Sequence, residues 1–459
     1  MNLQFYDPLY GQVGIPEAIT PLVNSYWFRR LQYLRQLGLC YLCFPGGNHT
    51  RFEHSIGTFF LARLVGETPL VKDLAPQFDE PSRKRFSLLL QLSALSHDLG
   101  HGPFSHMTEN VLIGLGATVT HEDMSAAIVT HHLQREFRPF RKHGVEPKVV
   151  GQIITKEAAL DPSAQAAKDL ISSDLDLDRI DYLHRDSHYS GVGTGRFVPE
   201  HDLVDVWRLR HFRNTVAIEL TNRGIKFAER VLFMRRTNYQ EIVFHSDHMC
   251  ATAMFEKAVW IAYKERNSEF GKRCKDIIAL RHHHWAERAF KKHIIPVASR
   301  LYSLVDYEAL QLLAQASSDA QYIVRRIRQR SLYRRLGRWN WSNLHFLAKQ
   351  KILSMKREAD AFGFRRRLEE FLAAKVNESD IHIVVHLALY KHPRGLSIGA
   401  SGGRLLEESS ALANFFKEDY VHSYAIELYY DPVLSQDVQN ALREMAEDMF
   451  VDGNIEITG

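Results

Sequence analysis

The strongest constraint on the fold lies between Arg83 and Asp98. There the run RKRFSLLLQLSALSHD combines strong helix formers with apolar side chains on nearly every face. A helix that is apolar all round is stable only when other elements surround it, so we expect it inside a protein core. The helix is expected to end near Gly100, Gly102 and Pro103. The sequence therefore predicts a large globular core built mainly from helices.

Length and composition support an ordinary globular protein. The chain has 459 residues, enough for two or three domains. With 45% apolar and 24% charged residues, collagen-like, low-complexity and wholly disordered classes are excluded. Lys plus Arg exceed Asp plus Glu by only 4, which indicates a mild preference for anionic partners. Four cysteines, no signal-peptide pattern and no long apolar run predict a cytoplasmic protein with no membrane partner.

The pattern along the chain is helical first and mixed later. Helices are expected over 25–37, 54–65, 83–98, 122–133, 165–187, 225–263 and 432–450, and strands over 215–220, 381–390 and 424–430. The fold class is therefore expected to be mostly α, with a smaller C-terminal α+β region. We expect three domains: a helical core over 1–270, a basic helical region over 271–375 and an α+β module over 376–459.

The end of the buried helix carries a cluster of polar groups that requires an explanation. His97 and Asp98 are followed by His101 and His106, and unpaired polar groups beside an apolar core are costly. Imidazole and carboxylate ligands suit a divalent ion such as Zn, Mn, Fe, Ni or Mg. Adjacent helical side chains diverge by about 100°, but they can converge where glycines let the helix end unwind. The alternative is a His97–Asp98 pair that caps the helix without metal.

Two further blocks could complete such a site. Upstream, NHTRFEHSIG contains Arg51 and His54, and downstream the segment DLDLDRIDYLHRD is rich in aspartate. The acidic residues of that segment are Asp174, Asp176, Asp178, Asp181 and Asp186. A calcium-binding EF-hand loop needs glycine at its sixth position and glutamate at its twelfth, where this chain has Arg179 and Arg185. The aspartates therefore do not form an EF-hand.

The order H…HD…D across these blocks resembles the HD phosphohydrolase superfamily. The resemblance is to the branch of dNTP triphosphohydrolases that includes the SAM-and-HD-domain proteins. It is carried by DPLYG at 7–11, RLQYLRQLG at 30–38, FPGGNHTRFEHSIG at 44–57, LSHDLGHGPFSH at 95–106, HED at 121–123 and DLDRIDYLHRDSHYSG at 176–191. These blocks cover somewhat over half of the chain, and their combination is specific. The 1–270 region is thus expected to be an HD-domain phosphohydrolase core.

The resemblance implies a role for each matching position. It assigns one divalent metal ion to His54, His97, Asp98 and Asp178. It assigns catalysis to His101, His106 and His121, with Glu109 standing where the family has aspartate. It assigns phosphate contacts to Arg51, Arg179 and Arg235, and sugar or nucleotide contacts to Gln36, Leu37, Tyr182, Asp186 and His245.

The activity implied by the resemblance is hydrolysis of a dNTP at the α-phosphate, which releases a deoxynucleoside and triphosphate. Val243 occupies a position where these enzymes carry a tyrosine against the sugar, so other nucleotides or oligonucleotide ends remain alternatives. A homo-oligomer, either a dimer or a tetramer, is also expected from the resemblance. Seven arginines with interleaved aromatics over 321–341 suggest single-stranded nucleic-acid binding or, alternatively, an amphipathic helix at an interface.

Overall fold

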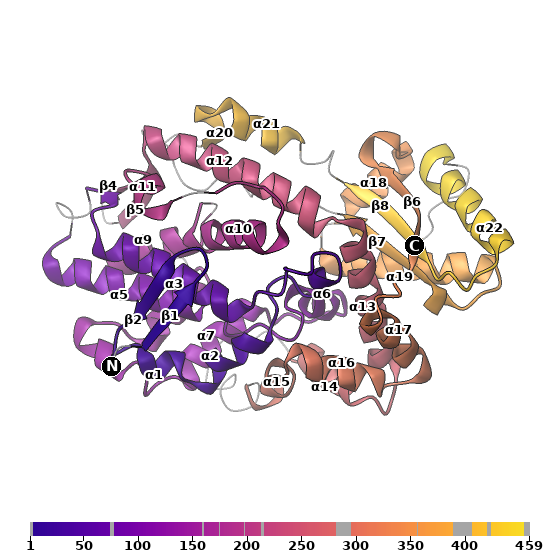
Figure 1. Ribbon diagram of the computed structural model, residues 1–459, viewed down its shortest axis with the longest axis horizontal. Helices are drawn as coiled ribbons and strands as arrows, with labels where there is room; N and C mark the ends of the chain where they lie inside the picture. Colours follow the sequence, from indigo (N-terminus) through magenta and orange to yellow (C-terminus); the bar gives the residue numbers. More distant parts are fainter. Residues whose placement is uncertain are drawn as a thin grey trace.

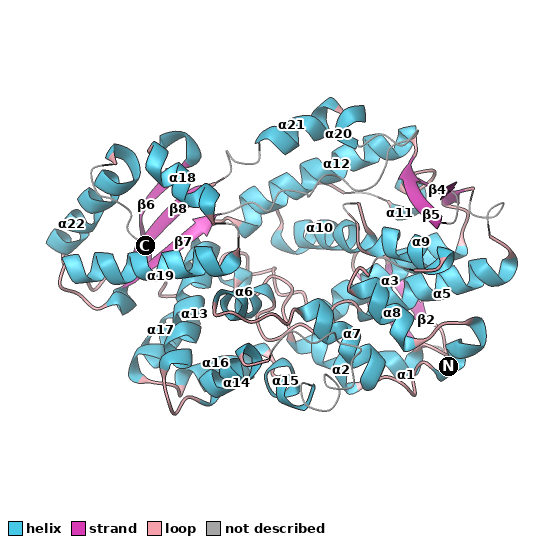
Figure 2. Ribbon diagram, turned by 180° about the vertical axis from the view of Figure 1, so that it is seen from behind, coloured by secondary structure: helices cyan, strands magenta, loops and turns pink. Residues whose placement is uncertain are grey.

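The computed structural model describes residues 3–73, 78–157, 160–173, 175–196, 198–212, 215–280, 295–355, 357–388, 406–419 and 424–453, which leaves Asp174 of the aspartate block outside. The described chain is mostly helical with small sheets, which confirms the expected fold class (Figure 1; Figure 2). No helix within the described ranges is both long and apolar enough to cross a membrane.

The first half of the chain surrounds the predicted buried helix. Its elements are β1 (Leu3–Asp7), β2 (Gly11–Ile15), α1 (Thr20–Val23), α2 (Tyr26–Arg30), α3 (Arg51–Glu67), β3 (Val71–Lys72), α5 (Glu80–Ser96), α6 (His106–Gly114), α7 (His121–His131), α8 (Pro147–Ile154), α9 (Pro162–Ile171) and α10 (Leu177–Ser190). Every residue of α5 from Phe86 to Ser96 is buried, as the all-round apolar pattern predicts. The α5 helix packs against α3 and α9 in the first hydrophobic cluster. This packing fixes the helix end that carries His97.

The middle of the chain contains two strands of the second small sheet and a series of helices. It comprises α11 (Pro199–Asp202), β4 (Trp207–Phe212), β5 (Thr215–Leu220), α12 (Asn222–Asn238), a π-turn at Tyr239–Val243, α13 (Ser246–Lys264) and α14 (Glu269–Ile278). The strand β5 coincides with the predicted strand and pairs antiparallel with β4. The α13 helix lies in a second hydrophobic cluster with α6 and α17, so it connects the first half of the chain to the rest.

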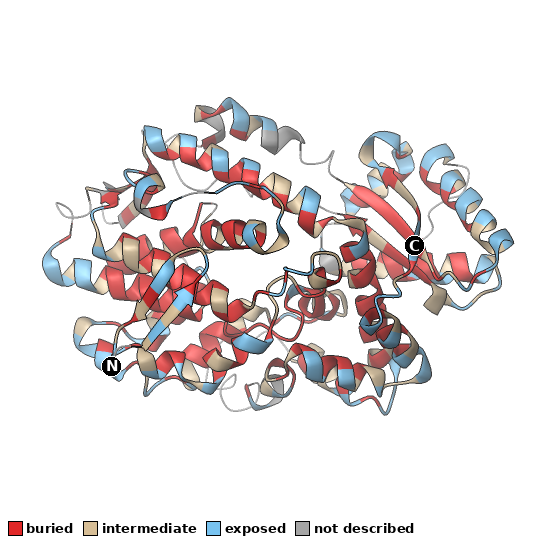
Figure 3. Ribbon diagram, in the orientation of Figure 1, coloured by how far each residue is buried: buried red, intermediate tan, exposed pale blue. Residues whose placement is uncertain are grey.

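The C-terminal part is built around one three-stranded antiparallel sheet. Its elements are α15 (Ile295–Tyr302), α16 (Asp306–Ala314), α17 (Ser318–Arg328), β6 (Arg334–Asn340), α18 (Phe346–Ser354), α19 (Glu358–Lys375), β7 (Ile383–Ala388), α20 (Leu406–Ser409), α21 (Ala411–Asp419), β8 (Ala425–Tyr430) and α22 (Gln436–Glu447). The strand order is β6-β8-β7, and β7 and β8 are mostly buried (Figure 3). Both were predicted; β6 was not.

Three predicted helices are interrupted in the structure. The helix expected over 25–37 ends at Arg30 and continues only as one 3-10 turn, because the next residues pair with the segment before α3. The helix expected over 165–187 is divided into α9 and α10. The helix expected over 225–263 is broken by the π-turn before α13.

The arginine-rich segment 321–341 does not form one helix. Its first half belongs to α17, which ends at Arg328, and its second half forms β6. Arg326 lies 3.1 Å from a carboxylate oxygen of Asp431, and Arg338 lies 3.0 Å from Glu427. The aromatic rings of Tyr333 and Trp339 are buried and cannot stack on bases. Two of the aromatics of the segment therefore serve the packing of the C-terminal part, while Tyr322 and Trp341 are partly exposed.

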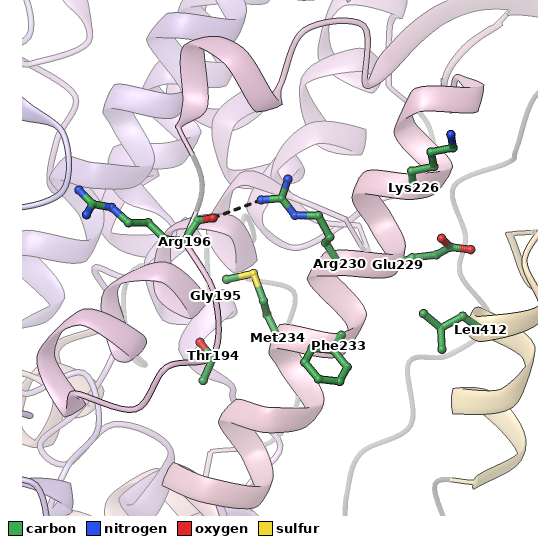
Figure 4. Close-up of a pocket in the computed structure, with 9 residues that line it drawn as sticks. All are labelled: Thr194, Gly195, Arg196, Lys226, Glu229, Arg230, Phe233, Met234 and Leu412. Carbon is green, nitrogen blue, oxygen red and sulfur yellow. Dashed lines mark hydrogen bonds between the residues drawn. The ribbon is translucent and has the colours of Figure 1, made fainter.

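A cavity of about 350 Å³ lies on the outer side of α12 (Figure 4). Arg230 of α12 donates a hydrogen bond to the backbone carbonyl of Arg196, 3.3 Å away, and Leu412 of α21 lies on the opposite side. None of the residues that the sequence assigned to catalysis or to the metal lines this cavity in the described chain. The chemistry is located elsewhere.

Candidate active site

The predicted metal ligands converge at the end of α5. His97 is the C-terminal cap of the helix, and Asp98 lies in the turn that follows, so the helix has unwound where both side chains must face the same point. Ligand atoms of His54, His97 and Asp98 lie within 4.8 Å of one another. Asp178, at the start of α10, approaches His54 Nε2 to 3.0 Å and His97 Nε2 to 3.7 Å. Three helices therefore bring two imidazoles and two carboxylates together.

The hydrogen bonds of the two imidazoles fit a metal site. His54 Nδ1 lies 2.8 Å from Asp181 Oδ2, and His97 Nδ1 lies 2.8 Å from the carbonyl oxygen of Ala94. Both Nδ1 atoms must donate in these bonds, which leaves each Nε2 as the ligand atom of a neutral ring. The two Nε2 atoms face each other at 3.2 Å. A divalent cation is the chemical group that this donor set accommodates best.

The electrostatics of the cluster also favour a cation. Burial opposes protonation of His54, but the neighbouring carboxylates of Asp178 and Asp181 outweigh it and raise the pKa of the imidazole to about 10. Burial would raise the pKa of Asp98, yet the guanidinium of Arg51 holds it well below its usual range. The carboxylates therefore stay ionised, and their field attracts positive charge to the point between the ligands.

A glycine allows α3 and α10 to come close enough for this geometry. A Cβ atom on Gly57 would lie 2.0 Å from Asp181 Oδ1 and 2.2 Å from Arg185 Nη2. Arg185 is itself held by Asp181 at 2.9 Å and by Asp7 at 2.9 Å, and all three side chains are buried. This ion network fixes Asp181, which in turn orients the His54 ring.

A second cluster adjoins the first. Ligand-type atoms of His101, His106, Glu109 and His121 lie within 4.8 Å of one another. Glu109 bridges two of the rings, since its carboxylate lies 2.9 Å from His106 Nδ1 and 2.8 Å from His121 Nδ1. The ring of His101 stacks on that of His121 at 3.9 Å. The longer Glu109 side chain therefore reaches both histidines.

Glu109 sets the charge of this cluster. Burial disfavours the cation of His121, but the carboxylate of Glu109 outweighs it and raises the pKa of the ring. Burial dominates at His106, whose pKa is lowered although Glu109 opposes the shift. Burial and the nearby Arg51 hold the pKa of His101 well below its usual range. His121 is thus the imidazole of this cluster most readily protonated near neutral pH.

The loop between the two clusters has an unusual backbone. Phe104 and Ser105 both adopt positive φ, at 55° and 53°, which side chains other than glycine rarely do. The conformation directs the Ser105 hydroxyl to Arg51 Nε, 2.6 Å away, instead of to the start of α6. Arg51 in turn places a second nitrogen 2.5 Å from Asp98 Oδ2. The loop thereby fixes the Arg51 guanidinium between the metal cluster and the open space beside it.

That open space is a cavity of about 450 Å³. The predicted residues that line it are Gln36, Leu37, Arg51, His106, Tyr182 and Asp186. Asp186 is buried, and its carboxylate oxygens accept hydrogen bonds from His49 at 2.9 Å and Asn238 at 3.0 Å. The remaining walls come from the loop before α6, the end of α12 and its π-turn, and from α6, α13, α19 and β7. The cavity therefore lies between the first half of the chain and the C-terminal sheet.

Three predicted contacts do not line this cavity in the structure. Arg179 and Arg235 both lie close enough to affect Tyr182, lowering a pKa that burial raises. His245 packs its ring against Phe44 at 5.2 Å. Arg179 and Arg235 therefore lie close to a residue of the cavity wall, whereas His245 contacts Phe44, which does not line the cavity.

Several residues that shape the site were not predicted. His49 and Asn238 hold Asp186, and Asp181 orients His54. Of these, His49 and Asp181 belong to blocks that the sequence motifs already mark, so their position could have identified them. Asn238 is the last residue of α12, directly before the π-turn, and lines the cavity; no sequence motif marks it.

Comparison with known proteins agrees with this geometry. Residues 51–186 match the HD domain family model, and that segment contains every residue of the two clusters. This segment is therefore similar to HD domains, and both its His/Asp and its His/Glu group could hold an ion.

Individual relatives extend the likeness beyond this segment. The deoxynucleoside triphosphate triphosphohydrolase SAMHD1 of Gallus gallus is 27% identical over 81% of this chain and 63% of its own length. The uncharacterized protein MJ1154 of Methanocaldococcus jannaschii is 25% identical over 92% of this chain and 78% of its own. The chain spans about half the length of several other curated relatives it matches. It is thus related to the SAMHD1 triphosphohydrolases.

A solved structure supports the fold as a whole. The crystal structure of a hypothetical protein from Aquifex aeolicus superposes with a TM-score of 0.65 and covers 96% of this chain and all of its own, at 23% identity. The likeness concerns the fold alone. The C-terminal sheet is therefore part of an arrangement that also occurs in another protein.

Proposed function

We propose that this chain is a metal-dependent dNTP triphosphohydrolase that cleaves its substrate at the α-phosphate into deoxynucleoside and triphosphate. The observation that carries the proposal is the meeting of three features at Arg51. The guanidinium hydrogen-bonds the metal-cluster residue Asp98, lies beside the histidine cluster and lines the cavity. An HD domain and the likeness to SAMHD1 proteins support the same reading.

Different residues of the site contact the phosphates and the sugar of the substrate. Arg51 binds phosphate oxygens through its planar fork of donors, with Arg179 and Arg235 adding positive charge close to Tyr182. Tyr182, Asp186 and Gln36 line the part of the cavity where the sugar would lie. A divalent ion held by His54, His97, Asp98 and Asp178 would polarise a phosphate oxygen and lower the pKa of water.

The histidine cluster supplies the proton for the leaving 5′ oxygen. His106 is the cluster member that lines the cavity. Glu109 links it through the two Nδ1 atoms to His121, which is the better cation. Because Nδ1 of His106 donates to Glu109, its Nε2 carries a proton only when the ring is an imidazolium, the form that the charge of Glu109 favours. That imidazolium transfers its Nε2 proton to the leaving oxygen.

The first experiment removes the metal ligands. His97→Ala combined with Asp98→Ala should abolish bound divalent metal, measured by plasma emission spectrometry, and reduce turnover to background. The matched control is the His-Asp dipeptide at positions 201 and 202, which lies outside both clusters and has an exposed histidine: His201→Ala with Asp202→Ala should keep both metal and turnover. Retention of either metal or turnover by the first variant would overturn the metal assignment.

The product identifies the reaction. Each dNTP incubated with Mn, Mg or Fe should release tripolyphosphate and deoxynucleoside; release of inorganic phosphate alone, or of nothing, would refute the proposal. Ribonucleotides belong in the same assay, because Val243 lines the cavity where a larger side chain would take up more of the space. The homo-oligomer implied by the resemblance is tested separately by light scattering.

A further inference from the structure

We propose that the end of the cavity nearest the C-terminal sheet is a nucleobase subsite, formed by α13, α19 and β7, that discriminates between bases. The inference rests on the proposed function in one respect: it takes the cavity as the nucleotide site. The side chains concerned are His248, Thr252 and Glu256 of α13, Arg365 of α19 and His386 of β7. None of them belongs to the sequence motifs.

The helix α6 connects the catalytic groups to the helix α19 that carries Arg365. It begins at His106 and ends at Gly114, so its rise is about 12 Å. A Cβ atom on Gly114 would lie 2.5 Å from the ring of Phe362, which shows how closely α6 abuts α19. His106 of α6 and Arg365 of α19 both line the cavity, so one nucleotide with its phosphates near His106 could also contact Arg365.

The imidazole of His248 presents an unused acceptor to the cavity. Its Nδ1 donates to the carbonyl oxygen of Val243, 3.1 Å away, so the neutral ring carries its lone pair on Nε2. The Nε2 atom of His248 is buried and has no hydrogen-bond partner among the described residues. Since His248 is only 7% exposed, bulk water does not readily replace that partner. Burial also lowers the pKa of this histidine, which keeps the ring neutral. A ligand N–H is what this atom lacks.

His386 adds a second unused polar atom. Its Nδ1 is buried with no partner in the described chain. Burial and the nearby Arg365 hold the pKa of this ring well below its usual range, so it too is neutral. A buried polar atom without a partner costs about 1–3 kcal/mol. Two such atoms on one cavity wall are expected where a ligand supplies the missing hydrogen bonds.

The ion pair of Arg365 and Glu256 disfavours binding of an anion and favours binding of the polar edge of a ring. Arg365 places a guanidinium nitrogen 2.5 Å from Glu256 Oε2, and both side chains are buried. Glu256 neutralises the guanidinium, so a phosphate group gains little there. Arg365 Nε has no partner among the described residues. The pair therefore offers donors and acceptors side by side, which complements the edge of a heterocyclic base.

Apolar side chains supply the surfaces that a flat ring needs. Met249 of α13 and Leu387 of β7 line the cavity on the same elements as His248 and His386. Thioether and aliphatic groups pack against the faces of aromatic rings while the polar groups meet the edge. Apolar walls with a polar edge are typical of base recognition and poorly suited to a further phosphate.

Binding of free deoxynucleosides tests the subsite without requiring catalysis. Calorimetry with the full-length protein should show one of the four deoxynucleosides bound about tenfold or more tightly than the weakest, since a site with buried hydrogen-bonding groups penalises the wrong edge. Arg365→Met with Glu256→Met removes both charges together and should reduce this ratio to about two or less. His386→Leu should also reduce it.

The control variant removes a pair that joins the same two helices on the surface. Lys264→Met with Glu370→Met, whose side chains are about half exposed, should leave the base preference unchanged. A preference that persists in both subsite variants, or its absence from the wild type, overturns the inference. Base preference without any release of tripolyphosphate would refute the proposed function and leave the subsite standing.

Discussion

Glu109 is the residue on which the proposed proton chemistry depends most. One carboxylate contacts the Nδ1 atoms of both His106 and His121, and also accepts the backbone N–H of His121 at 2.8 Å. Burial would raise the pKa of this carboxyl, yet the neighbouring imidazoles hold it well below its usual range. Glu109 therefore remains an anion and stabilises the protonated form of the rings around it.

Replacement of Glu109 should shift the pH profile of the reaction. Glu109→Gln removes the negative charge that raises the histidine pKa values, so the imidazolium deprotonates at lower pH. Since the proposed acid must be protonated, the basic limb of kcat should move to lower pH. At pH 8 we expect kcat to fall by about 10²-fold, a typical contribution of general acid catalysis. The measurement is kcat across pH 5 to 9.

The control for this variant keeps the charge. Glu109→Asp retains a carboxylate and should leave the basic limb close to that of the wild type, although the shorter side chain could lower kcat. If the glutamine variant kept the wild-type basic limb, Glu109 would not control the catalytic proton.

Individual residues differ in how well the sequence predicts them. His54, His97, Asp98 and Asp178 stand in compact motifs, and the structure brings them together. No local sequence pattern marks His248, Arg365 and His386, because they come from three different elements. More than 100 residues separate His248 on α13 from Arg365 on α19. They meet only through the packing of α13 against α19 and β7, which a motif does not encode.

The boundaries of helices are also hard to predict from the sequence where distant segments pair. The run 25–37 favours helix by composition, but Leu34 accepts a hydrogen bond from the backbone of Arg51 and Arg35 forms a bridge with Thr50. Pairing with a distant segment overrides local helix propensity here. The consequence is functional, because this bridge turns Gln36 and Arg51 toward the same cavity. The uninterrupted helix α5, whose apolar pattern is strong, was predictable.

The close contact of α3 with α10 depends on Gly57. Gly57→Ala places a methyl group against Asp181 and Arg185, both fully buried, so the helices must separate or the ion pair must shift. Such overpacking typically costs about 1–3 kcal/mol. Because Asp181 orients His54, we also expect metal affinity to fall by about 10- to 100-fold. Calorimetric melting and metal titration measure the two effects.

Gly193 provides the comparison for Gly57. It has no atom within 4 Å of an added Cβ, so Gly193→Ala should change neither the melting temperature nor the metal affinity. Equal behaviour of the two alanine variants would show that the helix contact does not control the metal site.

The molecule as a whole places its cavity where two separately packed parts meet. The first hydrophobic cluster surrounds α3 and α5, and the third lies on the C-terminal sheet and its helices. The second cluster, around α13, touches both sides. The metal ligands come from α3, the end of α5 and α10 in the first part. His106 and Glu109 come from α6, which packs in the second cluster, and the proposed base-reading groups come from α13, α19 and β7. Any loosening between these parts should therefore affect base selection before it affects the metal site.

Lys257 of α13 is the residue that should reveal this coupling. Its ammonium is buried and lies 2.9 Å from Glu369 of α19 and 2.6 Å from Asp380. Removing one partner of a buried ion pair typically costs about 3–5 kcal/mol, because the remaining charges lose their compensation. Lys257→Met should therefore lower the melting temperature and accelerate proteolysis between α19 and β7.

The surface pair on the same helices separates this effect from a general one. Lys264→Met disrupts a contact of 3.4 Å between half-exposed side chains, for which about 0–1 kcal/mol is typical, and should leave stability almost unchanged. In the Lys257 variant, bound metal at 25 °C should stay at the wild-type level while the preference among deoxynucleosides weakens, because α13 and α19 carry Glu256 and Arg365. Loss of bound metal together with base preference would mean that the metal site and the base subsite depend on the same packing.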